Sequence, residues 1–135
     1  PRRLTAVIEE VLRWETPVAV LPRLCLPGTQ ISNIEISPES IVLFAIAAAN
    51  RDPAVFENPD CFDPQRERHS NLTFGLGTHS CPGLHMARSS IGIATEVLLT
   101  RMPNLHFSDE LAARPVGVTL RGPKVLPIHG RTKRF

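Results

Sequence analysis

The sequence lacks the features that mark several large classes of protein. Its longest apolar run, IVLFAIAAA at Ile41–Ala49, is much shorter than the roughly 20 residues of a membrane helix, so we expect no membrane span and read it as a core segment. The formal net charge is only +2 and no run of five or more Lys and Arg occurs, which argues against nucleic-acid binding. The N-terminal arginines precede no apolar block, so a signal peptide is not indicated.

Cysteine is also scarce. Cys25, Cys61 and Cys81 are odd in number, widely spaced and form no CxxC pair. This pattern argues against a disulfide scaffold and favours a reducing, cytoplasmic location.

The 135 residues, 42% of them apolar, suffice for one modest core. We therefore expect residues 1–135 to be a single partial domain. Because the chain begins at Pro1 without an initiator Met, we also expect it to be an excerpt of a longer protein.

Apolar spacing predicts two main helices. Leu4, Val7, Ile8, Val11 and Leu12 recur at helical intervals, which indicates an amphipathic helix over Arg3–Glu15 that stops before Pro17. A second helix is predicted from about Pro82 to Pro103, with Leu84, Ile91 and Leu98 one heptad apart.

Short β-like segments and loops separate and follow these helices. Strand-like pieces are predicted at residues 18–26, 29–37 and 40–46, a short helix from about Ala45, and a loop over Asp52–Ser70. The tail, residues 114–128, resembles a hairpin that turns at 121–123. The expected class is mainly α with small β-sheets (α+β).

The segment TFGLGTHSCPGLHMAR, Thr73–Arg88, concentrates the candidate chemistry. Pro82 suits the first position of a helix, which puts Cys81 at or beside the N-cap, where the helix dipole lowers the pKa of a thiol. Gly75, Gly77 and Gly83 would let the backbone turn sharply or approach a large flat group.

The residues alone leave several uses for the thiolate open. It could be a nucleophile with His79 or His85 as base, a zinc ligand with the same histidines, an axial ligand of haem iron, or an inert cysteine in a tight turn. A dinucleotide-binding loop is excluded, because Ser80 occupies the position of the third glycine.

Three motifs in the right order resemble those of the cytochrome P-450 family. Phe74–Arg88 resembles its haem-binding loop, Glu10–Arg13 its ExxR motif and Phe62–Arg66 its FxPxR motif. AANRDPAVF, at residues 48–56, is typical of soluble bacterial members. The resemblance covers nearly all of the chain but only the C-terminal third of the family's fold.

The resemblance implies roles for the loop residues. Cys81 would be the thiolate ligand of the iron of haem b and the catalytic residue, and Gly75 and Gly83 would let the loop approach the haem. Phe74 would pack near the sulfur, while His79 and Arg23 would meet haem propionates. On the residues alone, a surface arginine on a strand is the alternative interpretation of Arg23.

The resemblance also implies contacts beyond the haem. Glu10, Arg13 and Arg66 would form a structural charge cluster. The substrate would touch Val18, Ala19, Val20, Leu21, Gly117, Val118 and Thr119. Arg68, His85 and Arg88 would offer a basic surface to a ferredoxin, or form a solvated face.

The implied activity is oxidation of an apolar organic substrate with O2 and electrons from a ferredoxin and its reductase. The alternative is a truncated, catalytically inactive remnant of such an enzyme, because the oxygen-activating helix of the family is absent from these residues. A zinc-binding module on His79, Cys81 and His85 is the third interpretation.

Overall fold

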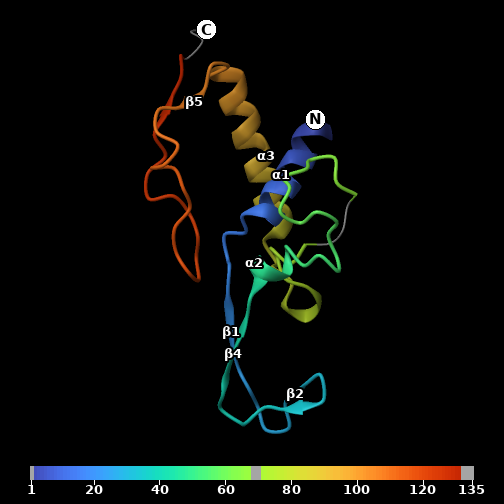
Figure 1. The fold of residues 1–135 in the computed structure, drawn as a ribbon. Helices are drawn as coiled ribbons and strands as arrows, with labels where there is room; N and C mark the ends of the chain where they lie inside the picture. Colours follow the sequence, from blue (N-terminus) through green and yellow to red (C-terminus); the bar gives the residue numbers. More distant parts are fainter. Residues whose placement is uncertain (1, 68–70, 132–135) are drawn as a thin grey trace.

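The structure, a computed structural model, describes residues 2–67 and 71–131. It contains the α-helices α1 (Arg2–Trp14), α2 (Ile46–Ala49) and α3 (Leu84–Arg101) and a 3-10 turn, η1 (Gly77–His79). Its strands form small two-stranded antiparallel sheets. The predicted α+β class is therefore confirmed, and Figure 1 shows α1 and α3 packed side by side with the ribbons extending from them.

The helix α1 forms where its spacing predicts and ends one residue earlier than predicted, at Trp14. Pro17 follows closely and restricts the backbone before it. Ile8 and Leu12 are buried, as an amphipathic stripe requires. Glu10 and Arg13, on the same helix, are buried as well, so this side of the core is polar as much as apolar.

The strands β1 (Leu21–Leu24) and β4 (Ile41–Phe44) pair antiparallel, with Leu21 opposite Phe44. Between them, β2 (Gln30–Ile31) and β3 (Ile34–Glu35) form a tight hairpin. We predicted a single strand over residues 29–37, and this was wrong. Ser32 and Asn33 adopt φ angles of 49° and 66°, the left-handed conformation of a two-residue hairpin turn.

In the tail after α3, β5 (His106–Phe107) and β6 (Ile128–His129) pair antiparallel with each other. The predicted turn at 121–123 was wrong, because the chain reverses before it. Val116 and Gly122 exchange backbone hydrogen bonds of 3.0 and 3.2 Å, and Gly117, at φ +113°, lies inside the reversal. A Cβ there would lie 2.0 Å from the Leu120 carbonyl oxygen, so the glycine sets the turn.

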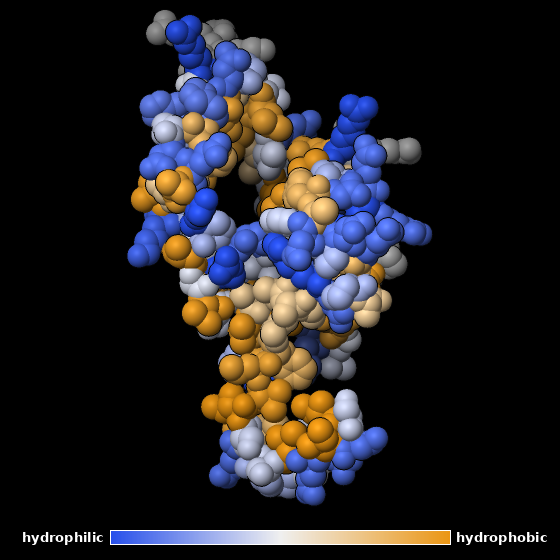
Figure 2. Space-filling view, in the orientation of Figure 1, coloured by the Kyte–Doolittle hydropathy of each residue, from blue (hydrophilic) through white to orange (hydrophobic). Residues whose placement is uncertain are grey.

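Apolar side chains gather on the surface of the β1–β4 ribbon (Figure 2). Leu24, Ile41 and Leu43 are each more than 60% exposed. An exposed apolar patch of this kind is typical of a contact surface. In the described part of the chain, no helix combines the length and the apolar character needed to cross a membrane.

Candidate functional site

The loop before α3 closes tightly on itself. Gly75 and Gly77 have φ angles of +68° and +63°, which favour glycine strongly. A Cβ on Gly75 would lie 2.9 Å from the carbonyl oxygen of His79, so a larger residue would force the loop apart. The Cys81 N–H donates a 2.7 Å hydrogen bond to the Phe74 carbonyl and fixes the cysteine at the end of the loop.

Cys81 lies one residue further from α3 than predicted. The N-cap is Gly83, and Pro82 precedes it instead of beginning the helix. The Leu84 N–H donates to the Cys81 carbonyl at 3.2 Å, so an additional turn separates the cysteine from the helix. The thiol is partly exposed, and none of the described side chains hydrogen-bonds to it.

The competing uses of the thiol find no support in this geometry. No group of three or more His, Cys, Asp and Glu side chains converges on a metal position within residues 2–67 and 71–131, so His79, Cys81 and His85 do not form a zinc site there. Within the same residues neither histidine hydrogen-bonds to the cysteine, as a nucleophile's base would.

A charge cluster forms from the side chains of Glu10, Arg13 and Arg66. The Arg13 guanidinium donates two hydrogen bonds to the Glu10 carboxylate, at 2.8 Å from Nε to Oε2 and at 2.7 Å from Nη2 to Oε1. Arg66 Nε approaches the same Oε1 at 3.4 Å. Glu10 is 5% and Arg13 only 2% exposed, so this is a buried charge cluster that no single helix could form.

The Glu10 carboxylate is held ionised by its surroundings. Burial on its own would raise the pKa of Glu10, since it disfavours the charged form. The hydrogen bonds from Arg13 and from the Asp63 N–H, together with the charges of Arg13 and Arg66, outweigh burial and leave the pKa below its ordinary value.

The two arginines also tie the loop after α2 to α1. Arg13 Nη1 donates to the carbonyl oxygens of Asn50 and Pro59, both at 2.9 Å. Arg66 donates to the carbonyls of Glu57, Asn58 and Cys61. The long loop therefore wraps around the charge cluster, which explains why it needs no regular secondary structure.

A buried amide that the sequence interpretation did not single out connects this cluster to the cysteine loop. Asn50 is 0% exposed. Its Oδ1 accepts the Leu72 N–H at 2.7 Å, and its Nδ2 donates to the Thr73 hydroxyl at 3.1 Å. That hydroxyl donates to the Leu12 carbonyl at 2.7 Å. Asn50 lies in the AANRDPAVF segment, and the similarity of that segment to known proteins was the sequence signal that could have identified Asn50.

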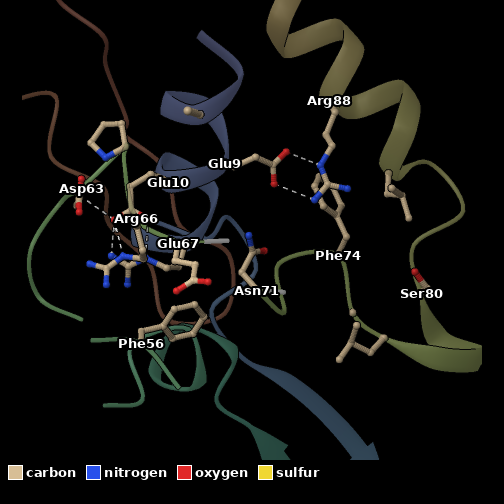
Figure 3. Close-up of a pocket in the computed structure, with 16 residues that line it drawn as sticks. Glu9, Glu10, Phe56, Asp63, Arg66, Glu67, Asn71, Phe74, Ser80 and Arg88 are labelled. Carbon is tan, nitrogen blue, oxygen red and sulfur yellow. Dashed lines mark hydrogen bonds and ion pairs between the residues drawn. The ribbon is translucent and has the colours of Figure 1, made fainter. Parts of the chain in front are cut away.

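A second unpredicted contact joins α1 to α3. Glu9 and Arg88 form a two-pronged ion pair, with Nε–Oε1 at 2.7 Å and Nη2–Oε2 at 3.0 Å. Figure 3 shows this pair beside Phe74 at the wall of a hollow of about 470 Å³. The hollow lies between α1, the loop after α2 and the cysteine loop, and Glu10, Arg13 and Arg66 also line it.

The other predicted site residues lie on separate segments. Arg23 is exposed on β1, and its guanidinium donates only to the neighbouring Pro22 carbonyl among the described residues. His79 is exposed at the end of η1. Of the predicted basic surface, Arg68 lies outside the described residues, and Arg88 is paired with Glu9.

The structure brings the two predicted substrate segments together. The Ala19 N–H donates to the Thr119 carbonyl at 2.8 Å, and Val18 and Leu120 form an isolated β-bridge. Ala19 is 5% exposed, whereas Val118 is 82% exposed. A ligand that binds beside these two segments would therefore contact the exposed Val118 more easily than the buried Ala19.

The residues around Cys81 fit a haem. The site offers one soft sulfur donor without a partner among the described side chains, as iron in a haem–thiolate requires. The glycine positions keep side chains away from the approach to it, and a Cβ on Gly83 would already touch the sulfur at 3.8 Å. A large flat group can therefore lie close to this backbone.

Known proteins are similar to this chain in sequence and in fold. The family model for cytochrome P450 matches residues 3–106. A biotin biosynthesis cytochrome P450 of Bacillus subtilis is 38% identical over 86% of this chain and 30% of its own length. The structure of cytochrome P450 CYP109Q5 from Chondromyces apiculatus superposes with a TM-score of 0.88 at 34% identity, over 97% of this chain and 34% of that one.

A further solved relative carries a ligand. CYP109E1 from Bacillus megaterium, in complex with testosterone, matches with a TM-score of 0.86 at 29% identity, over 95% of this chain and 36% of that one. The chain spans about a third of the length of the relatives that it matches. From the family match over residues 3–106, the shared fold and the cysteine loop, the chain belongs to the cytochrome P450 family.

Proposed function

We propose that this chain is the haem-binding portion of a cytochrome P450 monooxygenase and that Cys81 supplies the axial thiolate. The observation that carries the proposal is the closed loop from Phe74 to Gly83, which presents beside glycines a sulfur to which no described side chain hydrogen-bonds. When bound, haem b would supply the activation of O2, and its thiolate ligand would push electron density towards the iron.

The chain's own residues would hold and orient the group. Cys81 would bind the iron, with the loop kept rigid by the bond from its N–H to the Phe74 carbonyl. Phe74 would shield the sulfur from water. Gly75 and Gly83 would admit the haem plane, while His79 and Arg23 would bind propionates as cationic or hydrogen-bonding partners.

The proposed substrate is an apolar organic molecule. Val18, Val20 and Leu21, close to the exposed turn with Val118 and Thr119, offer apolar surface with one hydroxyl. The relative solved with testosterone binds an apolar molecule of this kind.

The proposed electron donors are a ferredoxin and its reductase in the cytoplasm. His85 on the exposed side of α3 would take part in docking. Arg88 contributes less than a free cation would, because Glu9 neutralises it. The proposal treats residues 1–135 as a single partial domain of the larger P450 fold.

The proposal is tested by reconstituting the purified protein with haem and recording the spectrum of its reduced CO complex. A thiolate-type Soret band, with about one haem per chain by pyridine haemochromogen assay, is the expected result. An absent or histidine-type band would contradict the proposal. A thiolate-type band without turnover of apolar substrates would favour the catalytically inactive alternative.

A further inference from the structure

We propose that Glu9 and Arg88 are positioning residues for Cys81. Their ion pair holds the Arg88 guanidinium over the ring of Phe74, and Phe74 in turn holds the cysteine. The inference deepens the proposed haem site and, for its role towards haem, rests on it.

The first link is the fixed orientation of Arg88. Both prongs of the guanidinium bond to Glu9, at 2.7 and 3.0 Å, across 79 positions of sequence. The side chains are 35% and 26% exposed, so water reaches the pair without surrounding it. A guanidinium that donates two parallel hydrogen bonds to one carboxylate cannot rotate freely, whereas a guanidinium held by a single hydrogen bond can.

The second link is the cation–π contact between Arg88 and Phe74. The guanidinium carbon of Arg88 lies 4.9 Å from the centre of the Phe74 ring (Figure 3). An arginine held over an aromatic face attracts the ring and restricts its rotamer. The Phe74 side chain therefore contacts α3 through Arg88, and a change of the Phe74 rotamer would break this contact.

The third link is the backbone of the loop. The Phe74 carbonyl accepts the Cys81 N–H at 2.7 Å, and the next residue, Gly75, has a φ of +68°, which glycine adopts without strain. A shift of Phe74 would pull directly on the bond that fixes Cys81. The contacts thus run without interruption from α1 through α3 and Phe74 to the backbone of Cys81.

A second ion pair provides a matched control. Glu15, which directly follows α1, pairs with Arg121 of the tail at 2.5 Å, and the Arg121 and Glu15 side chains are 33% and 30% exposed. Arg121 also donates to the Gly117 carbonyl, and no described residue of the cysteine loop takes part in this pair. Arg121→Lys and Arg88→Lys therefore each replace an arginine that pairs with a glutamate of similar exposure, and it is the Arg88 guanidinium that lies against Phe74.

The direct test measures the alkylation rate of Cys81 by iodoacetamide in the haem-free protein. The background carries Cys61→Ser, because Cys61 is exposed whereas Cys25 is buried. We expect Glu9→Gln and Arg88→Lys to raise the rate about fivefold, the change that a loss of roughly 1 kcal/mol in holding the loop produces. Arg121→Lys should leave it unchanged. Equal rates in all variants would overturn the inference.

A charge swap separates positioning from simple helix packing. Glu9→Arg with Arg88→Glu restores the ion pair between α1 and α3 but places a carboxylate against Phe74. We expect the unfolding midpoint to recover and the Cys81 rate to stay raised. Recovery of both would show that the pair acts through helix packing alone, and would overturn the role of Phe74.

Haem-loaded protein gives the second readout. We expect Arg88→Lys, and not Arg121→Lys, to shift the iron reduction potential, because the ligand geometry changes. If wild-type protein binds no haem while Arg88→Lys still accelerates alkylation, the proposed function fails and the positioning of Cys81 stands. If haem binds and neither quantity moves, the positioning fails and the function stands.

Discussion

Replacing Glu10 by Gln removes one negative charge from the buried cluster with little change of shape. Arg13 is 2% exposed and gives Glu10 both prongs of its guanidinium, while Arg66 and the Asp63 N–H approach the same oxygen. A glutamine offers one oxygen and an NH2 group, so at least one arginine N–H then faces another donor. Breaking such a pair costs about 3–5 kcal/mol.

The magnitude belongs at the lower end of that range. Arg66 keeps its bonds to the carbonyls of Asn58 and Cys61, and its side chain is 11% exposed, so part of its charge remains solvated. We expect Glu10→Gln to lower the free energy of unfolding by about 3 kcal/mol. Urea unfolding measures this through Trp14, the single tryptophan, which adjoins Arg13 and Arg51.

The control is Glu15→Gln, at the residue that directly follows the same helix. Its partner Arg121 is 33% exposed, and an exposed pair of this kind contributes about 0.2–1 kcal/mol. If Glu10→Gln costs no more than Glu15→Gln, the cluster does not stabilise the fold as we argue.

Acidification provides an independent check of the same carboxylate. The pKa of Glu10 is lowered in the folded protein, so its contribution is complete above its ordinary pKa of about 4.3 and is lost as pH falls through the folded value. The stability gap between wild type and Glu10→Gln should therefore narrow below about pH 4. A gap that stays constant down to acid unfolding would refute the reasoning.

Four further substitutions test the surrounding structure. Arg66→Ala should give protein that folds poorly or loses haem, and wild-type haem content would contradict the cluster's role. Asn50→Ala should lower the free energy of unfolding by about 2–3 kcal/mol in urea, because the Leu72 N–H loses its acceptor, whereas Asn50→Asp retains one. Gly75→Ala should cost at least about 1–2 kcal/mol in the same assay, because φ is +68° there and His79 blocks a Cβ; an unchanged midpoint would refute the strain. Pro82→Leu adds an amide that can reach the sulfur, so a redox titration should give a higher Fe(III)/Fe(II) potential; no change or a drop would refute this.

Local signals predicted most of the fold. Apolar spacing placed α1, and proline placed the ends of α1 and α3, because both depend on neighbours within one or two turns. Glycine and cysteine spacing identified the loop around Cys81 for the same reason. The errors arose where one residue's backbone conformation decided the turn, at Asn33 and Gly117.

Contacts across the chain were less accessible. The Glu9–Arg88 pair spans 79 residues, and the bond from Leu72 to Asn50 spans 22. Nothing in the local sequence distinguishes Glu9 and Arg88 from solvated side chains, and only the similarity of the segment around Asn50 to known proteins pointed to that residue. The cluster of Glu10, Arg13 and Arg66 was predictable only because known motifs contain its members, since spacing alone gives a weak surface pair of about 0.2–0.5 kcal/mol.

The most direct test of the account compares the reduced CO spectra of haem-reconstituted wild type, Cys81→Ser and Cys61→Ser. We predict a thiolate-type Soret band in wild type and in Cys61→Ser and its complete loss in Cys81→Ser, because only the sulfur of Cys81 would ligate the iron. A thiolate-type band that survives in Cys81→Ser, or one that disappears in Cys61→Ser instead, would contradict the assignment of the haem ligand.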